Sequence, residues 1–182
     1  MKELLKMIAG KCIRLRPWRE DDILKLAELR NDIKLQSQLL SRVRGSNGDQ
    51  TRQWLQQRSS NSGNLLFIIA DKDSDAPLGY IQFVEIEPVD QVAKLGICLS
   101  PEVQAKGIGY EVLLLAFNYL YNSWAIRKVI LEVRDDNKGA IKCYEKLGFL
   151  QCGKYSKHKY IDGKWHDLIM MELFLNTLVN KQ

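Results

Sequence analysis

Short segments of alternating or continuous apolar residues, each bounded by turn-forming residues, recur along the chain. They cover residues 11–18, 64–71, 78–87, 92–100 and 128–133. Alternation with a period of two, or a short apolar run between turn residues, is typical of a β-strand. We therefore predict five strands in this part of the sequence.

The C-terminal part of the sequence predicts a hairpin. Residues 154–174 alternate on both sides of Asp162 and Gly163. An Asp-Gly pair between alternating segments is the strongest short signal for a two-residue hairpin turn. This hairpin brings the predicted total to seven strands. Its long apolar strands suit either the core or a homodimer, and the sequence leaves both readings open.

Four segments have helical spacing instead. Residues 20–32 begin with acidic residues, and apolar residues then recur at intervals of three and four. Residues 50–58 predict a second, short helix, which we expect Asp49 to cap. Residues 109–124 predict a long apolar helix. Residues 137–148 predict a helix that ends at a glycine.

The order of these elements defines the fold class. We predict one α+β domain over residues 1–182, with its core at about 11–175. The predicted order is strand, helix, helix, three strands, helix, strand, helix and two strands. We expect a central, mainly antiparallel seven-stranded sheet flanked by about four helices. Whether residues 1–10 form an ordered helix stays open.

Composition narrows the class of protein. The chain has 182 residues, of which 46% are hydrophobic and 27% charged, which is ordinary for a soluble globular protein. A net charge of +5 without a dense Lys/Arg stripe suits a small anionic ligand, not nucleic acid. Glu3 and Lys6 interrupt the apolar run that a signal peptide needs, and no stretch is long enough to cross a membrane. We therefore predict a cytoplasmic protein with no membrane partner.

The four cysteines predict neither a metal site nor a disulfide. They form no Cys-x-x-Cys pair and lie near no histidine at metal-ligand spacing. We expect reduced thiols and no metal. The two histidines, His158 and His166, lie on the last hairpin, where surface and substrate-pocket positions are equally plausible.

The stretch SPEVQAKGIGYEVLLLAFNYL, residues 100–120, places two glycines where a helix begins. A Walker loop is excluded because Lys106 precedes Gly107, and a dinucleotide fingerprint is excluded because Val112 replaces its third glycine. Exposed N–H groups at a helix start attract anions, and glycines allow close approach. On these residues alone, a phosphate cradle and a simple turn are equally favoured.

Two motifs together resemble the GNAT superfamily of acetyl-CoA-dependent N-acetyltransferases. Gln104-Ala105-Lys106-Gly107-Ile108-Gly109 matches the family's Gln/Arg-x-x-Gly-x-Gly/Ala, and NKGAIKCYEKLGF (137–149) matches its Asn, Ala, Tyr and Gly-Phe signature. The closing YIDGKWHDLIMMEL is similar to the branch of ribosomal-protein, spermidine and nucleotide-aminosugar acetyltransferases. The resemblance covers about residues 11–175.

This resemblance implies how acetyl-CoA binds. The amides of the glycine loop would hold the pyrophosphate, and the pantetheine arm would lie between splayed strands, here 92–100 and 128–134. Asn137 would reach that arm and Ala140 would leave room for it. The expected cofactor-binding residues are Ile97, Cys98, Leu99, Gln104, Ala105, Lys106, Gly107, Ile108, Gly109, Asn137 and Ala140.

The resemblance also implies a direct transfer to a primary amine. Tyr144, at the signature's tyrosine, is the expected general acid for the leaving thiolate. Relatives often have a glutamate where this chain has Lys94, so the base must come from elsewhere. We expect Glu85, with Glu132 as second choice. Cys143 is a small buried hydrophobe in this interpretation, because no His or Asn partner is recognisable near it.

The acceptor is the least determined part. Residues 42–58 carry four arginines against one aspartate, which disfavours a polycation and suits phosphate. A solvated face, or binding of the adenosine 3′-phosphate, explains these arginines equally well. We predict a nucleotide-linked amino sugar, with a protein N-terminus, a polyamine and a non-catalytic acyl-CoA-binding role as alternatives. The expected substrate-binding residues are Arg30, Asn31, Arg44 and Trp54.

Overall fold

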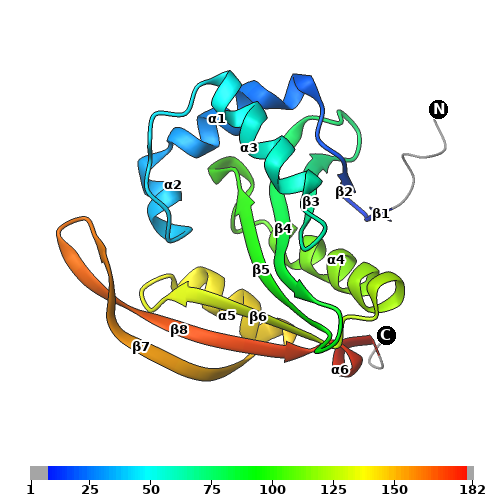
Figure 1. The fold of residues 1–182 in the computed structure, drawn as a ribbon, viewed down its shortest axis with the longest axis vertical. Coiled ribbons are helices and arrows are strands. Elements are labelled where there is room, and N and C mark those ends of the chain that lie inside the picture. The colour runs from blue at the N-terminus through cyan, green and yellow to red at the C-terminus, as the bar shows by residue number, and fades with distance from the viewer. Residues whose placement is uncertain (1–7, 180–182) are drawn as a thin grey trace.

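One twisted sheet organises residues 8–179, the part of the chain that the computed structural model describes (Figure 1). Its strand order is β1-β2-β3-β4-β5-β6-β8-β7, and β5 and β6 form its parallel pair. All seven predicted strands are present, and the short β1 is an addition. The strands are β1 (Ile8–Ala9), β2 (Ile13–Arg16), β3 (Leu65–Asp71), β4 (Pro77–Glu87), β5 (Val92–Leu99), β6 (Lys128–Arg134), β7 (Leu150–Ile161) and β8 (Lys164–Phe174).

The helices agree with the prediction except near the two ends of the described chain, where α1 and α2 replace one predicted helix and the short α6 is an addition. The predicted helix over 20–32 begins with a 3-10 turn and ends at Asp32, whose extended backbone and side chain start a second helix. The cap of the next helix was predicted wrongly, since Asn47 rather than Asp49 accepts from the Gln50 N–H at 2.9 Å. The helices are α1 (Ile23–Asn31), α2 (Ile33–Gln38), α3 (Gly48–Ser60), α4 (Ile108–Trp124), α5 (Lys138–Leu147) and α6 (Asn176–Val179).

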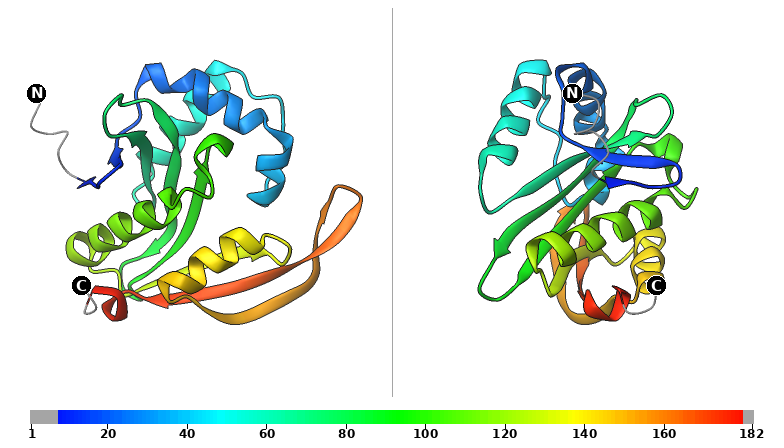
Figure 2. Two further views of the ribbon diagram at one scale, coloured as in Figure 1. Left: turned by 180° about the vertical axis from the view of Figure 1, so that it is seen from behind. Right: turned by 90° about the vertical axis from the view of Figure 1, so that its right-hand side faces the viewer.

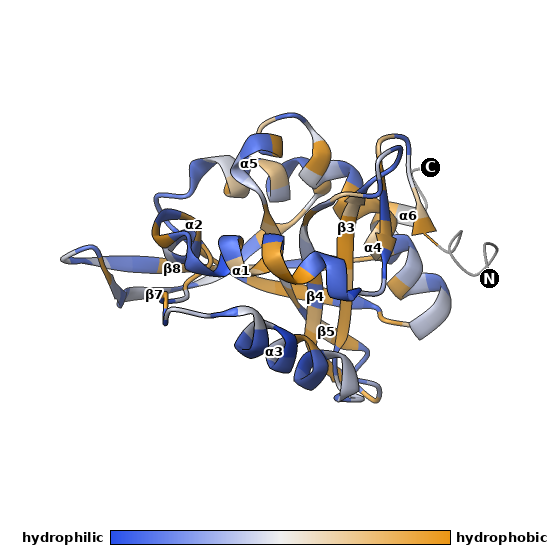
Figure 3. Cartoon of the chain, turned by 90° about the horizontal axis from the view of Figure 1, so that it is seen from above, coloured by the Kyte–Doolittle hydropathy of each residue, from blue (hydrophilic) through white to orange (hydrophobic). Residues whose placement is uncertain are grey.

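Helices cover both faces of the sheet (Figure 2). The larger core forms where α4 and the end of α5 pack on one face, with Phe83, Phe117 and Phe149 at its centre. A smaller core lies on the other face beneath α1 to α3, around Leu26 and Leu55. Figure 3 shows the apolar strands β3, β4 and β5 beside helices of mixed polarity. The two cores hold the central strands in place from both sides.

The sheet divides between β5 and β6. These strands pair over three positions, from Val92 opposite Lys128 to Lys94 opposite Ile130. Beyond them β5 stays paired with β4, and β6 stays paired with β8, so the two halves of the sheet diverge (Figure 1). The predicted splay is confirmed. It leaves an opening bordered by backbone on both sides.

The last hairpin, β7 and β8, extends away from the body of the molecule (Figure 1). Asp162 and Gly163 have φ of +49° and +76°, as the predicted two-residue turn requires. Leu168, Met171 and Leu173 of β8 are buried in the core, while most of β7 is exposed. Among residues 8–179, no helix combines the length and the apolar character that a membrane crossing requires.

Candidate active site

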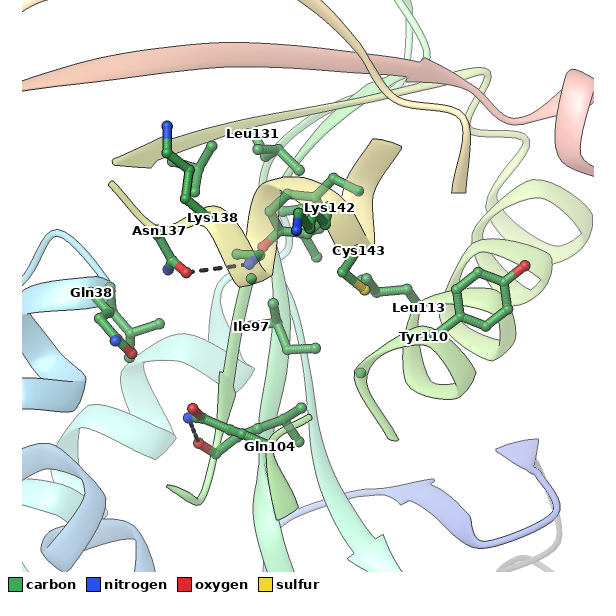
Figure 4. A pocket seen from close by; sticks show the side chains of 18 of the residues that line it. Gln38, Ile97, Gln104, Tyr110, Leu113, Leu131, Asn137, Lys138, Lys142 and Cys143 are labelled. Atoms are coloured by element: carbon green, nitrogen blue, oxygen red, sulfur yellow. Dashed lines mark hydrogen bonds between the residues drawn. The ribbon is translucent and has the colours of Figure 1, made fainter. Parts of the chain in front are cut away.

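A cavity of about 780 Å³ lies at the opening of the sheet. It is bordered by β5 and β6, the starts of α4 and α5, and the end of α2. Figure 4 shows that Asn137 and Cys143 of α5, Ile97 of β5 and Gln104 approach it from different sides. The two sequence motifs therefore meet across one cavity, although more than twenty-five residues separate them.

The glycine loop has the geometry of an anion cradle. Gly107 has φ of +80° and precedes α4 without a side-chain cap, so no side chain of the cap residue occupies the first N–H groups of the helix. A Cβ on Gly107 would meet nothing within 4 Å. Ala105 also has positive φ. Gln104, Ala105, Gly107 and Gly109 line the cavity, whereas Lys106 and Ile108 are outside its lining.

The backbone of β5 presents polar groups to the opening at every second residue. The Ser100 N–H donates to the Leu78 carbonyl at 2.8 Å on the β4 side. Because N–H groups alternate along a strand, the N–H of Cys98 also faces β4, and those of Ile97 and Leu99 face the opening. Ile97 and Leu99 line the cavity. The prediction for Cys98 is therefore corrected, because neither its N–H nor its side chain reaches this space.

Neither cysteine near the cavity is suited to nucleophilic attack. Cys98 is 1% exposed and lies against Tyr80 beneath α1 and α3. Burial raises the pKa of its thiol to about 12. Cys143 lines the cavity, but burial raises its thiol pKa as well. Both thiols therefore stay protonated at neutral pH, as expected for small apolar side chains.

Helix α5 brings the second motif to the cavity. The Asn137 side chain accepts from the Ala140 N–H at 3.2 Å and so caps the helix (Figure 4). Its amide nitrogen stays available for a ligand. Lys138, Lys142 and Lys146 follow at four-residue intervals along the same face and line the cavity. These lysines were missed from the sequence because, without the fold, they resemble an ordinary solvated helix face.

Tyr144 lies between the cavity and the larger core. It lines the cavity, and its ring packs at 5.6 Å from that of Phe149. Burial raises the pKa of its hydroxyl well above the ordinary value, with the neighbouring Cys143 as a smaller cause. The phenol therefore stays protonated at neutral pH. A protonated hydroxyl beside the ligand space is what a general acid needs.

The structure separates the two candidate bases. Glu85 is exposed, has φ of +52° at a β-bulge, and is outside the cavity lining, so its position does not support the predicted role. Glu132, the second choice, lines the cavity. Its carboxylate accepts from Lys94 Nζ at 3.1 Å. Of the two, the structure places only Glu132 at the cavity, because the bulge at Glu85 and the splay beside Glu132 are tertiary features that no short sequence pattern marks.

The four predicted substrate residues do not reach the cavity. Arg30 lies 4.5 Å over the Trp54 ring and donates to Ser46 Oγ, and Asn31 holds the Ser46 backbone through both its amide atoms. Arg44 is exposed. None of these four lines the cavity. The contacts of Arg30 and Asn31 with Ser46 instead hold the segment that joins α2 to α3.

Helix α2 supplies the wall that the sequence missed. Leu35 and Gln38 of α2 line the cavity, together with Leu39 and Leu40 directly after the helix. Arg134 connects this wall to the α5 side. It is 8% exposed, donates to both oxygens of Asp136, at 2.8 and 2.5 Å, and also to the Ser37 carbonyl. These bonds lower the pKa of Asp136.

One group of possible metal ligands lies beside this wall. Donor atoms of Asp135, Asp136 and His166 are within 4.8 Å of one another. Both oxygens of Asp136 already accept from Arg134, and His166 Nδ1 is 3.5 Å from Asp136. The arrangement is thus that of an ion-pair network. His158 stacks on Tyr155 on the exposed hairpin, away from the cavity.

Comparison with known families identifies the class of protein. Residues 13–150 match the model described as acetyltransferase (GNAT) domain. The chain therefore belongs to the GNAT acetyltransferase family, as its two motifs implied. The crystal structure of Vibrio cholerae spermidine N-acetyltransferase in complex with CoA and spermine is similar, with a TM-score of 0.86 at 21% identity over 92% of this chain and 98% of that one. At this identity the likeness concerns the fold alone.

Individual relatives differ in their named substrates. The spermidine N(1)-acetyltransferase of Escherichia coli strain K12 is 34% identical over 96 residues, which is 53% of this chain and 52% of that protein. That of Vibrio cholerae is 25% identical over 63% of this chain and 66% of that protein. A putative ribosomal N-acetyltransferase of Bacillus subtilis is 24% identical over 88% of this chain and 90% of that protein. The chain thus spans about half to two thirds of the length of the spermidine enzymes it matches.

Proposed function

We propose that this protein is an acetyl-CoA-dependent N-acetyltransferase whose acceptor is an aliphatic polyamine. The observation that carries the acceptor class is the composition of the cavity. Its acceptor side has leucines of α2 and the carboxylates of Glu132 and Asp136, while the arginines that suggested a nucleotide sugar lie elsewhere. The spermidine acetyltransferases among the relatives support the same class.

The donor side of the cavity fits coenzyme A. The N–H groups at the start of α4 suit the pyrophosphate, and the cationic Lys142 and Lys146 add charge for its phosphates. The N–H groups of Ile97 and Leu99 lack a β6 partner and suit the amides of the pantetheine arm. The bound thioester would supply an activated acetyl group.

The acceptor side fits an alkyl chain that carries charge. Leu35, Leu39 and Leu40 offer apolar contact for methylene groups. Glu132 and Asp136 attract ammonium groups, although Lys94 and Arg134 already share these carboxylates. An acceptor ammonium therefore competes with Lys94 for Glu132. A nucleotide diphosphate would bring further anionic charge beside both carboxylates and would be disfavoured.

Two side chains, Glu132 and Tyr144, carry out the proton transfers of the reaction. Glu132 takes a proton from the acceptor ammonium, because an alkylamine with a pKa of about 10.4 is protonated at neutral pH and cannot attack until it loses one. The Ile97 N–H would stabilise the charge that develops on the thioester carbonyl oxygen. Tyr144 then gives its proton to the leaving sulfur. Glu132 and Tyr144 border the same cavity from β6 and α5.

The test is continuous detection of free thiol from acetyl-CoA with a panel of acceptors. The panel contains spermidine, spermine, nucleotide-linked amino sugars and peptides with Ser or Ala at the N-terminus. Saturable release with the polyamines and with neither other class supports the proposal. Release with peptides would favour the second candidate, N-terminal acetylation, which the Bacillus subtilis relative suggests through its alignment over 88% of the chain. Release with amino sugars would overturn the acceptor assignment.

A further inference from the structure

One stripe of helix α5 faces the cavity and carries positive charge. Gly139, Lys142, Cys143 and Lys146 are three or four residues apart along the helix, and all four line the cavity. Figure 4 shows Lys142 and Cys143 on this part of α5. A Cβ on Gly139 would meet nothing within 4 Å, so the surface beside the stripe is open.

Lys146 connects this stripe to the start of α4. Its ammonium lies 4.7 Å from the centroid of the Tyr110 ring. Tyr110 belongs to the first turn of α4 and also lines the cavity. Burial raises the pKa of the Cys143 thiol, and the charge of Lys146 opposes that rise, so the charge acts on the cavity wall. The ammonium therefore lies beside the helix turn that follows the glycine loop.

Lys142 and Lys146 have no anionic partner in the described chain. Among residues 8–179, no carboxylate lies within 4.0 Å of either ammonium. Glu111, the acidic residue in the first turn of α4, instead accepts from the Cys12 N–H at 3.0 Å. Two positive charges at the cavity are thus left for an anion that enters it.

Coenzyme A carries phosphate in two places. Its pyrophosphate suits the N–H groups at the start of α4, as the proposed function assigns. Its other phosphate is on the 3′-oxygen of the ribose, on the far side of the pyrophosphate from the pantetheine arm. Lys106, the cation of the glycine loop, is outside the cavity lining. Lys146, by contrast, lines the cavity and contacts the first turn of α4.

We infer that Lys146, together with Lys142, binds the 3′-phosphate of coenzyme A and makes the protein selective for 3′-phosphorylated donors. The inference rests on the proposed function, because it concerns the same donor. It adds a specificity site at positions that neither sequence motif defines. A phosphate monoester carries about 1.5 to 2 negative charges at neutral pH. Two ammonium groups four residues apart, about 6 Å along the helix axis, match that charge.

The stripe would distinguish coenzyme A from other thioesters with the same pantetheine arm. Dephospho-coenzyme A lacks the 3′-phosphate and keeps the pyrophosphate. An acyl group on the phosphopantetheine arm of a carrier protein lacks the whole nucleotide. Both donors would still reach the N–H group of Ile97, but neither would bring a phosphate to Lys146. We therefore expect acetyl-CoA to be preferred to both as the donor.

The experiment measures the binding of coenzyme A and of dephospho-coenzyme A to the full chain by calorimetry. We expect coenzyme A to bind about tenfold more tightly, because each partly exposed ion pair contributes a factor of up to about five. Lys146→Gln should weaken coenzyme A binding about fivefold and dephospho-coenzyme A binding less than about twofold. Lys142→Gln should act in the same direction. Lys146→Arg keeps the cation and should keep the preference, and added salt should reduce it.

A matched variant and the two ligands separate the possible outcomes. Lys164→Gln changes the net charge equally, but Lys164 is exposed on the last hairpin outside the cavity lining, so both affinities should stay within about twofold. Equal losses for both ligands in Lys146→Gln would overturn the inference, because the lysine would then serve the pyrophosphate. Equal affinity of the unsubstituted protein for both ligands would also overturn it. In both cases coenzyme A binding would still support the proposed function, whereas binding of neither ligand would reject both.

Discussion

In the proposed function, the two walls of the cavity use different parts of the chain to bind their ligands. The donor wall, formed by β5 and the start of α4, presents backbone N–H groups at Ile97, Leu99 and the glycine loop. The acceptor wall, formed by α2 and β6, presents side chains such as Leu39 and Glu132. Backbone N–H groups are the same whatever the side chains are, so a wall made of them suits a ligand that stays the same. A wall made of side chains can come to bind a different ligand when its residues are substituted. The difference explains why the donor was easier to infer than the acceptor.

The largest expected effect is the loss of turnover when Tyr144, which acts on the donor while the acceptor attacks, loses its hydroxyl. Tyr144→Phe should lower turnover at least tenfold, and by about a hundredfold if proton donation is fully lost, because the leaving thiolate then has no acid. Coenzyme A affinity, measured by calorimetry, should stay nearly unchanged. Unchanged turnover would remove Tyr144 from the mechanism, and a large loss of affinity would mean that it belongs to the donor wall.

The next effect tests the acceptor wall. Glu132→Gln should lower turnover of spermidine by about tenfold at neutral pH, because the acceptor then reaches the thioester as an ammonium. The loss should shrink at higher pH, where more of the amine is already free. Glu85→Gln is the matched control, since Glu85 is exposed outside the cavity. A larger loss in Glu85→Gln would restore the original assignment.

A smaller effect tests the donor wall. Gly107→Val should weaken coenzyme A binding about fivefold, because a β-branched residue disfavours positive φ and would disturb the loop. The affinity for spermidine should change little. Gly109→Ala is the control, since its Cβ would lie 3.4 Å from Leu99 Cδ1, close to ordinary contact. Equal losses for both ligands would contradict the separation of the two walls.

The smallest expected effect concerns an arginine outside both walls. Arg44→Ala should leave the KM for spermidine and for acetyl-CoA within about twofold of the unmodified protein, because Arg44 is exposed and away from the cavity. Steady-state kinetics measures both constants. A clear rise in the KM of a nucleotide-linked amino sugar would instead return this arginine to the acceptor site.

Local patterns in the sequence were sufficient to predict most of the strands and helices of the fold. Apolar periodicity located the seven main strands, and Asp162-Gly163 located the last turn, because each depends on neighbours along the sequence. The break at Asp32 was missed because its extended backbone interrupts an otherwise helical spacing. The short β1 carries two residues, which is too few for a periodic signal.

The sequence located part of the cavity lining: most of the glycine loop, Asn137, Ala140, Tyr144 and, as a second choice, Glu132. The motif spanning Gln104 and Gly109 implied a cradle, and four of its six residues line the cavity at the start of α4. Glu132 and the leucines at the end of α2 line one cavity because the tertiary fold brings them there, and no short sequence pattern marks that arrangement. The charge of residues 42–58 gave no guide to the cavity, because none of its arginines lines it, and Arg52 is paired with Glu20 and Asp49, at 2.9 and 2.6 Å.

Arg134 makes the two walls dependent on each other. Its guanidinium is a rigid plane, held at one end by Asp136, next to the cap of α5, and at the other by Ser37 of α2. A ligand that displaces α2 must also strain or shift the start of α5. Such coupling is reciprocal: the factor by which an acceptor changes the affinity for coenzyme A equals the factor by which coenzyme A changes the affinity for that acceptor. One buried side chain would thereby set the cooperativity between the two substrates.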